Sequence, residues 1–166
     1  MARNTWRWLG RAFGAGVLLA VIGGVMVWSV SHDPDVWHVD PMGADRTGRP
    51  NDALVATTDA TRAEPDRVLA PIAETPDALM ARLDAAMMEK PRVARVARSG
   101  DGLHVTYVER SALIGFPDYI SVRALAGENG TNLAIWSRSR FGYSDMGVNA
   151  ARVDQLLDRL GLVSQP

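Results

Sequence analysis

The stretch "YISVRALAGENGTNLAIWSRSR", residues 119–140, contains two runs of strand type with the glycine-bearing segment "AGENG" between them. Alternation of apolar and polar residues with a period of two is typical of a β-strand that buries one face. A short glycine-containing segment between two such runs predicts a hairpin. We therefore expect antiparallel strands over 119–125 and 131–140.

The chain before this hairpin shows the same period. Residues 92–99 and 103–111 are separated by Gly100-Asp101-Gly102, which predicts a second hairpin. The connection 112–119, "ALIGFPDY", is longer and apolar, and we expect it to fold over an edge of the sheet. Alternation in the second run puts two sets of side chains on opposite faces: Leu103, Val105 and Tyr107 against His104, Thr106 and Val108.

Helical signals flank the four strands. Residues 67–72, "RVLAPI", suggest a short strand, and the next segment begins a helix with Thr75 as N-cap and Pro76 at the first helical position. A last helix follows the fourth strand, with Ser144 or Asp145 as cap and Gly161 at its end. The predicted fold class is α+β: an antiparallel four- to five-stranded sheet packed with two helices, in the order β-α-β-β-β-β-α. A sheet curled around the last helix would resemble a small helix-grip fold, by analogy alone.

Residues 12–31 carry no charge and predict one transmembrane helix before this domain. Twenty helical residues reach about 30 Å, the thickness of a bilayer core. Arginines precede the segment and acids follow it, which predicts a cytoplasmic N-terminus over 1–11 and a single-pass protein of the bacterial inner membrane with a periplasmic C-terminal domain. A signal peptide cleaved after Ser31 is the alternative.

Small residues recur along the predicted anchor, at Ala12, Gly16, Ala20 and Gly24. Such a ridge lets another helix backbone approach closely, so it could support self-association or a partner helix. Glycine and alanine are also common in single-span anchors, and this plainer explanation is favoured. The bilayer itself is the expected partner.

Residues 32–65 are acidic and proline-rich, and we expect an irregular linker before a domain over 66–162. One cluster in the linker could suggest a metal site, but no predicted element holds its ligands in place, so a solvated acidic face is favoured. The cluster comprises His32, Asp33, Asp35, His38 and Asp40.

Several classes of function are disfavoured by what the chain contains. It has no cysteine, which excludes disulfides and thiolate chemistry, and no basic stretch typical of nucleic-acid binding. Walker, dinucleotide and zincin motifs do not occur, and we expect no cofactor and no metal. The sequence does not decide whether the protein is an enzyme, and a protein without catalytic activity is favoured.

The junction "SRSRFGYSDMGVN", residues 137–149, concentrates polar groups between the last strand and the last helix. Arg138 and Arg140 share a strand face and could form an anion clamp, or they could pair with Asp118, Glu109 or Asp145 and only stabilise the corner. The structural explanation is favoured. The candidate binding residues are Arg138, Arg140, Tyr143, Ser144, Asp145 and Asn149.

The segment "RSRFGYSDMGVNAARV", 138–153, supported by "GFPDYISVR", 115–123, and "TYVERS", 106–111, resembles the DUF1499 family, a domain of unknown function. The resemblance covers residues 66–162 and implies the domain architecture of that family, but no activity, cofactor or substrate.

Two hypotheses on function follow from the residues. The first is a membrane-anchored envelope protein that binds a lipid, a small anionic ligand or a protein partner. The second is an uncharacterised hydrolase-type enzyme that uses Ser144, His104 and Asp145, although "GYSDMG" departs from the G-x-S-x-G nucleophile elbow. Proximity of His104 to Ser144 would favour the second.

Overall fold

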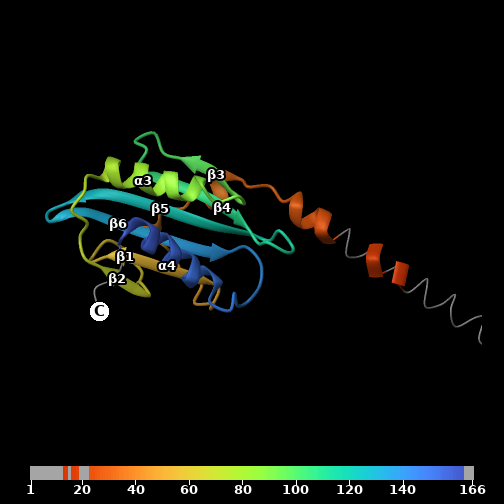
Figure 1. The fold of residues 1–166 in the computed structure, drawn as a ribbon. Helices are drawn as coiled ribbons and strands as arrows, with labels where there is room; N and C mark the ends of the chain where they lie inside the picture. The colour runs from red at the N-terminus through yellow and green to blue at the C-terminus, as the bar shows by residue number, and fades with distance from the viewer. Residues whose placement is uncertain (1–12, 15, 19–22, 163–166) are drawn as a thin grey trace, which may run out of the picture.

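A computed structural model describes residues 13–14, 16–18 and 23–162 of the chain (Figure 1). The elements follow in the order α2 (Pro34–Trp37), η1 (Pro41–Gly43), β1 (Asp52–Thr57), β2 (Arg67–Leu69), α3 (Pro76–Met88), β3 (Val93–Arg98), β4 (His104–Arg110), β5 (Pro117–Gly127), β6 (Gly130–Ser139) and α4 (Val148–Leu160).

The strands form one six-stranded sheet in the order β2-β1-β6-β5-β4-β3. Both predicted hairpins are present, since β3 pairs with β4 and β5 with β6, each pair antiparallel. The edge strand β2 is parallel to its neighbour β1, and β1 is antiparallel to β6. The predicted antiparallel sheet of four to five strands is therefore wrong: the sheet is mixed and larger.

Strand β1 accounts for the difference, because it lies in the segment that the sequence suggested was a linker. Residues 53–57 of this strand are all buried. A strand covered on both faces has a continuous apolar run in place of alternation, so its only signal was the short island "ALVA", 53–56. Residues 32–65 are thus not an irregular linker: they supply this central strand and much of one layer of the fold.

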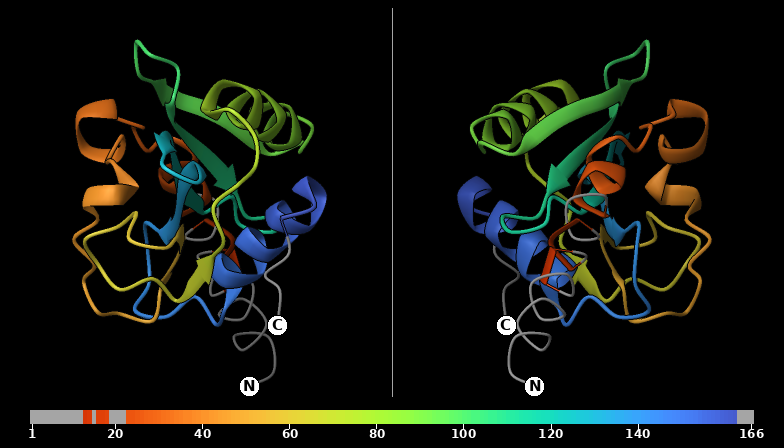
Figure 2. Two further views of the ribbon diagram at one scale, coloured as in Figure 1. Left: turned by 90° about the vertical axis from the view of Figure 1, so that its left-hand side faces the viewer. Right: turned by 90° about the vertical axis from the view of Figure 1, so that its right-hand side faces the viewer.

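Helices α3 and α4 lie side by side on one face of the sheet (Figures 1 and 2). The core is between them and the strands, and it includes Leu79 and Leu83 of α3, Leu157 of α4 and Tyr107 of β4. The predicted start of the first helix is confirmed, since the Thr75 side chain accepts a hydrogen bond from the amide of Ala78. This apolar core fills the helix side of the sheet.

The opposite face is covered by chain with little regular structure, from 29–50 and 58–66, so the fold has three layers (Figure 2). A smaller apolar cluster joins Leu54 and Trp136 of the sheet to Ala44 of this layer. Polar contacts between the layers surround that cluster, and they build the candidate site described below.

The helical residues before the domain, such as 23–28, run away from it at the end where β4 turns into β5 (Figure 1). Within the described residues, none of the helices has both the length and the apolar character that a bilayer crossing needs, so the predicted transmembrane helix over 12–31 is not found. Residues 1–11 lie outside the described part. So do Ala12 and Ala20 of the small-residue ridge, and its role in association, like the localisation, stays a prediction.

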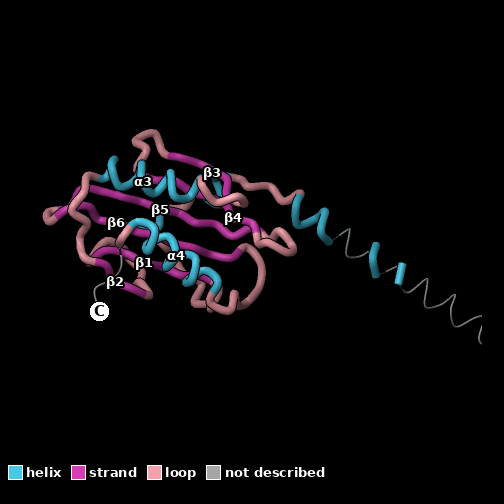
Figure 3. Tube along the Cα trace, in the orientation of Figure 1, coloured by secondary structure: helices cyan, strands magenta, loops and turns pink. Residues whose placement is uncertain are grey.

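The β4–β5 loop also differs from its expected course. Its Leu113 is 98% exposed and Ile114 is 51% exposed, so the segment does not fold over a sheet edge. The loop extends beyond the strand ends (Figure 3).

Candidate functional site

Arg138 on β6 faces the irregular layer and is almost completely buried, with 8% of its surface exposed. Its guanidinium carbon lies 4.1 Å from the centre of the Trp136 ring. It donates a hydrogen bond of 2.7 Å to the backbone oxygen of Trp37 and a longer one of 3.4 Å to the Ser121 hydroxyl. All of these partners are neutral.

Among the described residues, no carboxylate hydrogen-bonds to Arg138. Asp52 is the acid that acts on its charge, but the carboxylate oxygens of Asp52 already accept from Arg46 at 3.0 and 2.9 Å and from the Trp136 indole at 2.7 Å. Burial lowers the pKa of Arg138 to about 10, so the side chain remains a cation at neutral pH. A buried cation without a counter-ion is costly for a fold to maintain.

Arg140, two residues further along the chain and directly after β6, extends the same face. Its guanidinium donates to the backbone oxygen of Ser31 at 2.7 Å and to the Tyr119 hydroxyl at 3.0 Å. Its guanidinium carbon also lies 5.2 Å from the Trp37 ring centre and 5.6 Å from that of Phe141. Within the described chain, its hydrogen-bond partners are again neutral.

Trp37 is held in place by stacking. Its ring lies parallel to that of Tyr119, with centres 3.9 Å apart and planes 7° apart. The Tyr119 hydroxyl also bonds to His32 at 2.8 Å, and Arg110 bonds to the other nitrogen of that imidazole at 2.9 Å. The aromatic wall beside Arg138 and Arg140, formed by Trp37 on Tyr119, is therefore preorganised by contacts to the sheet.

Arg138 and Arg140 line a pocket of about 540 Å³ between the end of β6 and the irregular layer. This volume lies in the range of small-molecule sites, about 300 to 1,000 Å³. Arginine, hydroxyl, amide and aromatic groups dominate the lining: Trp37, Thr47, Arg49, Asn51, Asp52, Trp136, Arg138, Ser139, Arg140, Phe141, Gly142 and Tyr143. A second space of about 640 Å³ lies next to it around Arg46, whose charge is already paired with Asp52 and Asp66.

The other predicted site residues separate from this pocket, except for Tyr143 in its lining. Asp145 accepts hydrogen bonds from the amides of Gly147 and Asn149, so it has a structural role at the start of α4. The predicted cap at Ser144 or Asp145 is nevertheless wrong, because the N-cap residue of this helix is Gly147, whose backbone is left-handed. Asn149 is completely buried and bonds to the Asn51 carbonyl at 3.0 Å and the Ser137 hydroxyl at 2.6 Å. Ser144 is exposed and accepts from the amide of Met146.

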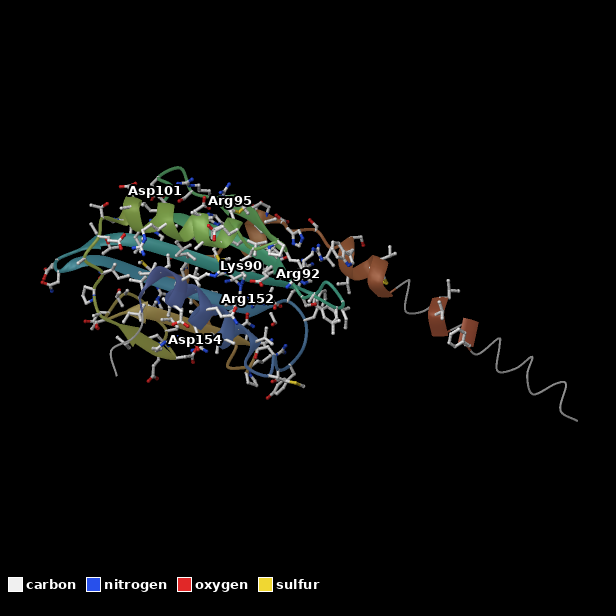
Figure 4. The ribbon with its side chains drawn as sticks, viewed as in Figure 1. Lys90, Arg92, Arg95, Asp101, Arg152 and Asp154 are labelled. Carbon is white, nitrogen blue, oxygen red and sulfur yellow. The ribbon has the colours of Figure 1, made fainter. Side chains whose placement is uncertain are left out.

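Arg152 of α4, which the sequence analysis did not select, is a buried arginine that the fold pairs with carboxylates. It bonds to Asp118 at 2.8 Å and to Glu109 at 3.0 Å, and Lys90 also bonds to Glu109. Burial raises the pKa of Asp118 against the opposing effect of the Arg152 charge. Lys90 and Arg152 both belong to the helix side of the sheet (Figure 4).

The hydrolase constellation does not assemble. His104 is buried at the start of β4, where its ring stacks on His38 with centres 3.7 Å apart and its Nε2 lies 3.2 Å from the Val39 oxygen. Ser144 lies beyond the end of β6, away from His104, since His104 pairs with Arg123, and Arg123 with Ala134 in the middle of β6. Burial lowers the pKa of His104 to about 4.

The residues of the acidic cluster separate as well. The His38 imidazole bonds to the Thr106 hydroxyl at 2.9 Å, on the sheet, whereas Asp33 and Asp40 cap α2 and η1. Across the part of the chain that the structure describes, no group of three metal-ligating side chains comes together.

The pocket residues from the irregular layer, Trp37, Thr47 and Arg49, were not predicted. No sequence signal identified them, because they lie in the segment that was assigned as linker. The stacking on Tyr119 that holds Trp37 is a contact between residues 82 positions apart along the chain.

A mixed sheet with two helices on one face and a pocketed irregular layer on the other defines an α+β domain with a cationic, aromatic site. The chain belongs to the family described as "Protein of unknown function (DUF1499)", whose model matches residues 45–160. That range starts earlier than the resemblance over 66–162 suggested, and it includes β1. No curated protein matches the chain.

Proposed function

We propose that the protein is a binding protein for a small anionic ligand with an apolar or aromatic part, held in the pocket beside Arg138 and Arg140. The observation that carries this proposal is the buried Arg138 on the pocket wall, which has a ring, a hydroxyl and a carbonyl as neighbours where an ion pair is normally found.

The guanidinium groups keep donors for a ligand. An arginine has five N–H groups, and the described contacts of Arg138 use two of them. Those of Arg140 come from a single nitrogen, Nη1. A carboxylate or phosphate oxygen at this wall would gain charge-assisted hydrogen bonds and would supply the missing counter-charge.

The remaining walls select the rest of the ligand. Trp37, Trp136 and Tyr143 contribute ring surface, and Thr47 and Asn51 contribute polar groups beside it. Aromatic rings pack favourably on such walls in offset or edge-on geometry. An aryl phosphate or an aryl carboxylate fits both parts of the site better than a bare inorganic anion does.

Calorimetric titration of the full-length chain with phenyl phosphate, and separately with inorganic phosphate, tests the proposal. We expect saturable binding of both, with phenyl phosphate the tighter. Arg140→Gln should weaken phenyl phosphate binding by about tenfold or more, because a hydrogen bond to a charged group contributes about 1.5–3 kcal/mol.

Arg92→Gln is the matched control. Arg92 is an exposed arginine before β3 that donates to the backbone oxygen of Arg110, and it does not line the pocket. Its substitution should leave both affinities unchanged. Equal affinities in Arg140→Gln and the unaltered chain, or no binding of either anion, would reject the proposed function.

A further inference from the structure

Two loops at one end of the sheet carry apolar side chains that are exposed. One loop joins β4 to β5 and the other joins β6 to α4, and Leu113 of the first and Met146 of the second are 98% and 95% exposed. We call the exposed apolar side chains of these loops the loop-end patch: Leu113, Ile114, Phe116, Phe141, Tyr143 and Met146.

The patch is continuous between the loops. The rings of Phe116 and Phe141, one from each loop, have centres 5.7 Å apart. Trp28 adjoins them, since a Cβ atom placed on Gly115 would lie 2.6 Å from its indole nitrogen. Exposed apolar side chains scattered singly are normal on a protein surface, but a contiguous group drawn from separate segments indicates an interaction surface.

The shape of the patch favours a lipid surface over a protein groove or peptide. The β4–β5 loop projects beyond the strand ends (Figures 1 and 3), and Leu113 and Met146 are almost fully exposed, so the surface protrudes and is not a groove. Apolar tips of this kind can insert among lipid chains. Tryptophan and tyrosine, here Trp28 and Tyr143, prefer the boundary between headgroups and chains.

The surroundings of the patch point the same way. Val25 and Met26, which precede the domain, are more than half exposed, and the described residues of 23–28 leave the domain at this end (Figure 1). Arg110 lies at the base of the β4–β5 loop, with its guanidinium 4.8 Å from the Trp28 ring centre. Its charge complements anionic headgroups, whereas the nearby carboxylates Asp118 and Glu109 are neutralised by Arg152.

We infer that the loop-end patch docks the domain on the surface of a lipid bilayer, with the β4–β5 and β6–α4 loops inserted and Arg110 facing anionic headgroups. This contact requires no spanning segment. It does not use Arg138 or Arg140, and it shares only Phe141 and Tyr143 with the lining of the proposed ligand pocket, so either proposal can fail alone.

The chain has no cysteine, which allows a direct test of insertion depth. Full-length Leu113→Cys and Met146→Cys, each labelled with an environment-sensitive nitrobenzoxadiazole dye, are mixed with vesicles of equimolar phosphatidylcholine and phosphatidylglycerol. We expect a blue shift and a several-fold rise in emission, and quenching by lipids with a spin label in the acyl chain.

Val68→Cys is the matched control. Val68 is an apolar residue on the edge strand β2 and is 52% exposed. It is level with Ala134 of β6, because Val68 pairs with Ala56 and Ala56 pairs with Ala134. Ala134 is five residues before Ser139, so Val68 lies about 17 Å along the strands from the end of β6, at 3.4 Å per residue. Its dye should stay in water even if another part of the chain holds the protein on the vesicle.

If dyes at Leu113 and Met146 show the same emission and lipid quenching as the dye at Val68 in the presence of vesicles, the inference is overturned. A blue shift without vesicles that grows with protein concentration would overturn it too, because it would identify a second copy of the chain as the partner. As a further check, Leu113→Asp together with Met146→Asp should abolish lipid quenching of a dye at Ile114→Cys.

Discussion

Arg138 and Arg152 are both 8% exposed, yet their surroundings are opposite. Arg152 meets the carboxylates of Asp118 and Glu109 on the helix side of the sheet. Arg138 meets a tryptophan ring, a hydroxyl and a backbone carbonyl on the other side. The fold itself neutralises the charge of Arg152, whereas no carboxylate among the described residues hydrogen-bonds to Arg138. We propose from this contrast that Arg152 stabilises the fold and that Arg138 binds a ligand.

The largest effect is expected for Arg152→Met. The change removes Arg152 from the buried carboxylate of Asp118 and from the partly buried one of Glu109, which keeps Lys90 as a partner. Breaking a buried ion pair costs about 3–5 kcal/mol. The melting temperature of the full-length chain, followed by circular dichroism, should fall by more than about 10 °C.

Arg159→Met serves as its control. Arg159 lies on the same helix and its charge is 3.6 Å from Glu89, but both side chains are more than half exposed. Exposed ion pairs contribute about 0–1 kcal/mol, so this variant should melt close to the unaltered chain. Similar losses in the two variants would show that the Arg152 network is not the structural anchor.

Acid should weaken the fold through His104. Burial lowers the folded-state pKa of this imidazole to about 4, with a smaller contribution from the neighbouring His38, while the ordinary value is 6.5. The unfolded chain then binds more protons between these values, so the free energy of unfolding falls as the pH drops through that window. The titration of His104 lowers the free energy of unfolding by about 3 kcal/mol at most, because each unit of difference in pKa corresponds to 1.36 kcal/mol.

Urea unfolding at about pH 7 and about pH 4.5 measures this loss. The raised pKa of Asp118 has the opposite effect, because it increases the free energy of unfolding as the pH drops. A variant at His104 is therefore needed to isolate the contribution of this histidine. His104→Asn should have a flatter dependence on pH than the unaltered chain. If the two dependences coincide, the titration of His104 does not set the acid sensitivity.

The sequence allowed the hairpins and the start of the first helix to be predicted because their signals are local. Gly100-Asp101-Gly102 between alternating runs, and Thr75 before Pro76, act on their own neighbours in the chain. Strand β1 was missed for a physical reason. It is buried on both faces between β2 and β6, and this removes the alternation by which a half-buried strand is recognised.

The candidate site could be predicted only in part. The alternation in β6 placed Arg138 and Arg140 on one face, but it could not show which charges they meet. Asp118 and Glu109, offered as their partners, lie on the helix face with Arg152. The aromatic wall depends on Trp37 stacking on Tyr119 across a long stretch of chain, and no local pattern encodes such a contact.

A smaller effect is expected for Asp145→Ala. The carboxylate accepts hydrogen bonds of 2.8 Å from the amide of Asn149 and 3.0 Å from that of Gly147, at the start of α4. Loss of such hydrogen bonds costs about 1 kcal/mol, so thermal unfolding should show a fall of a few degrees. Ser144→Ala, which removes only a long bond from the Met146 amide, is the control and should be near neutral. A neutral Asp145→Ala would contradict a structural role for this residue at the start of α4.

The most direct test of the contrast between the two arginines is Arg138→Met, measured beside Arg152→Met for the free energy of unfolding and for phenyl phosphate binding. Removing Arg138 loses two hydrogen bonds of about 1 kcal/mol each but also removes a buried charge that lacks a partner, so the net change should stay within about 1 kcal/mol. Phenyl phosphate binding should be lost. A destabilisation as large as that of Arg152→Met, with phenyl phosphate binding retained, would contradict the distinction between a stabilising and a binding arginine.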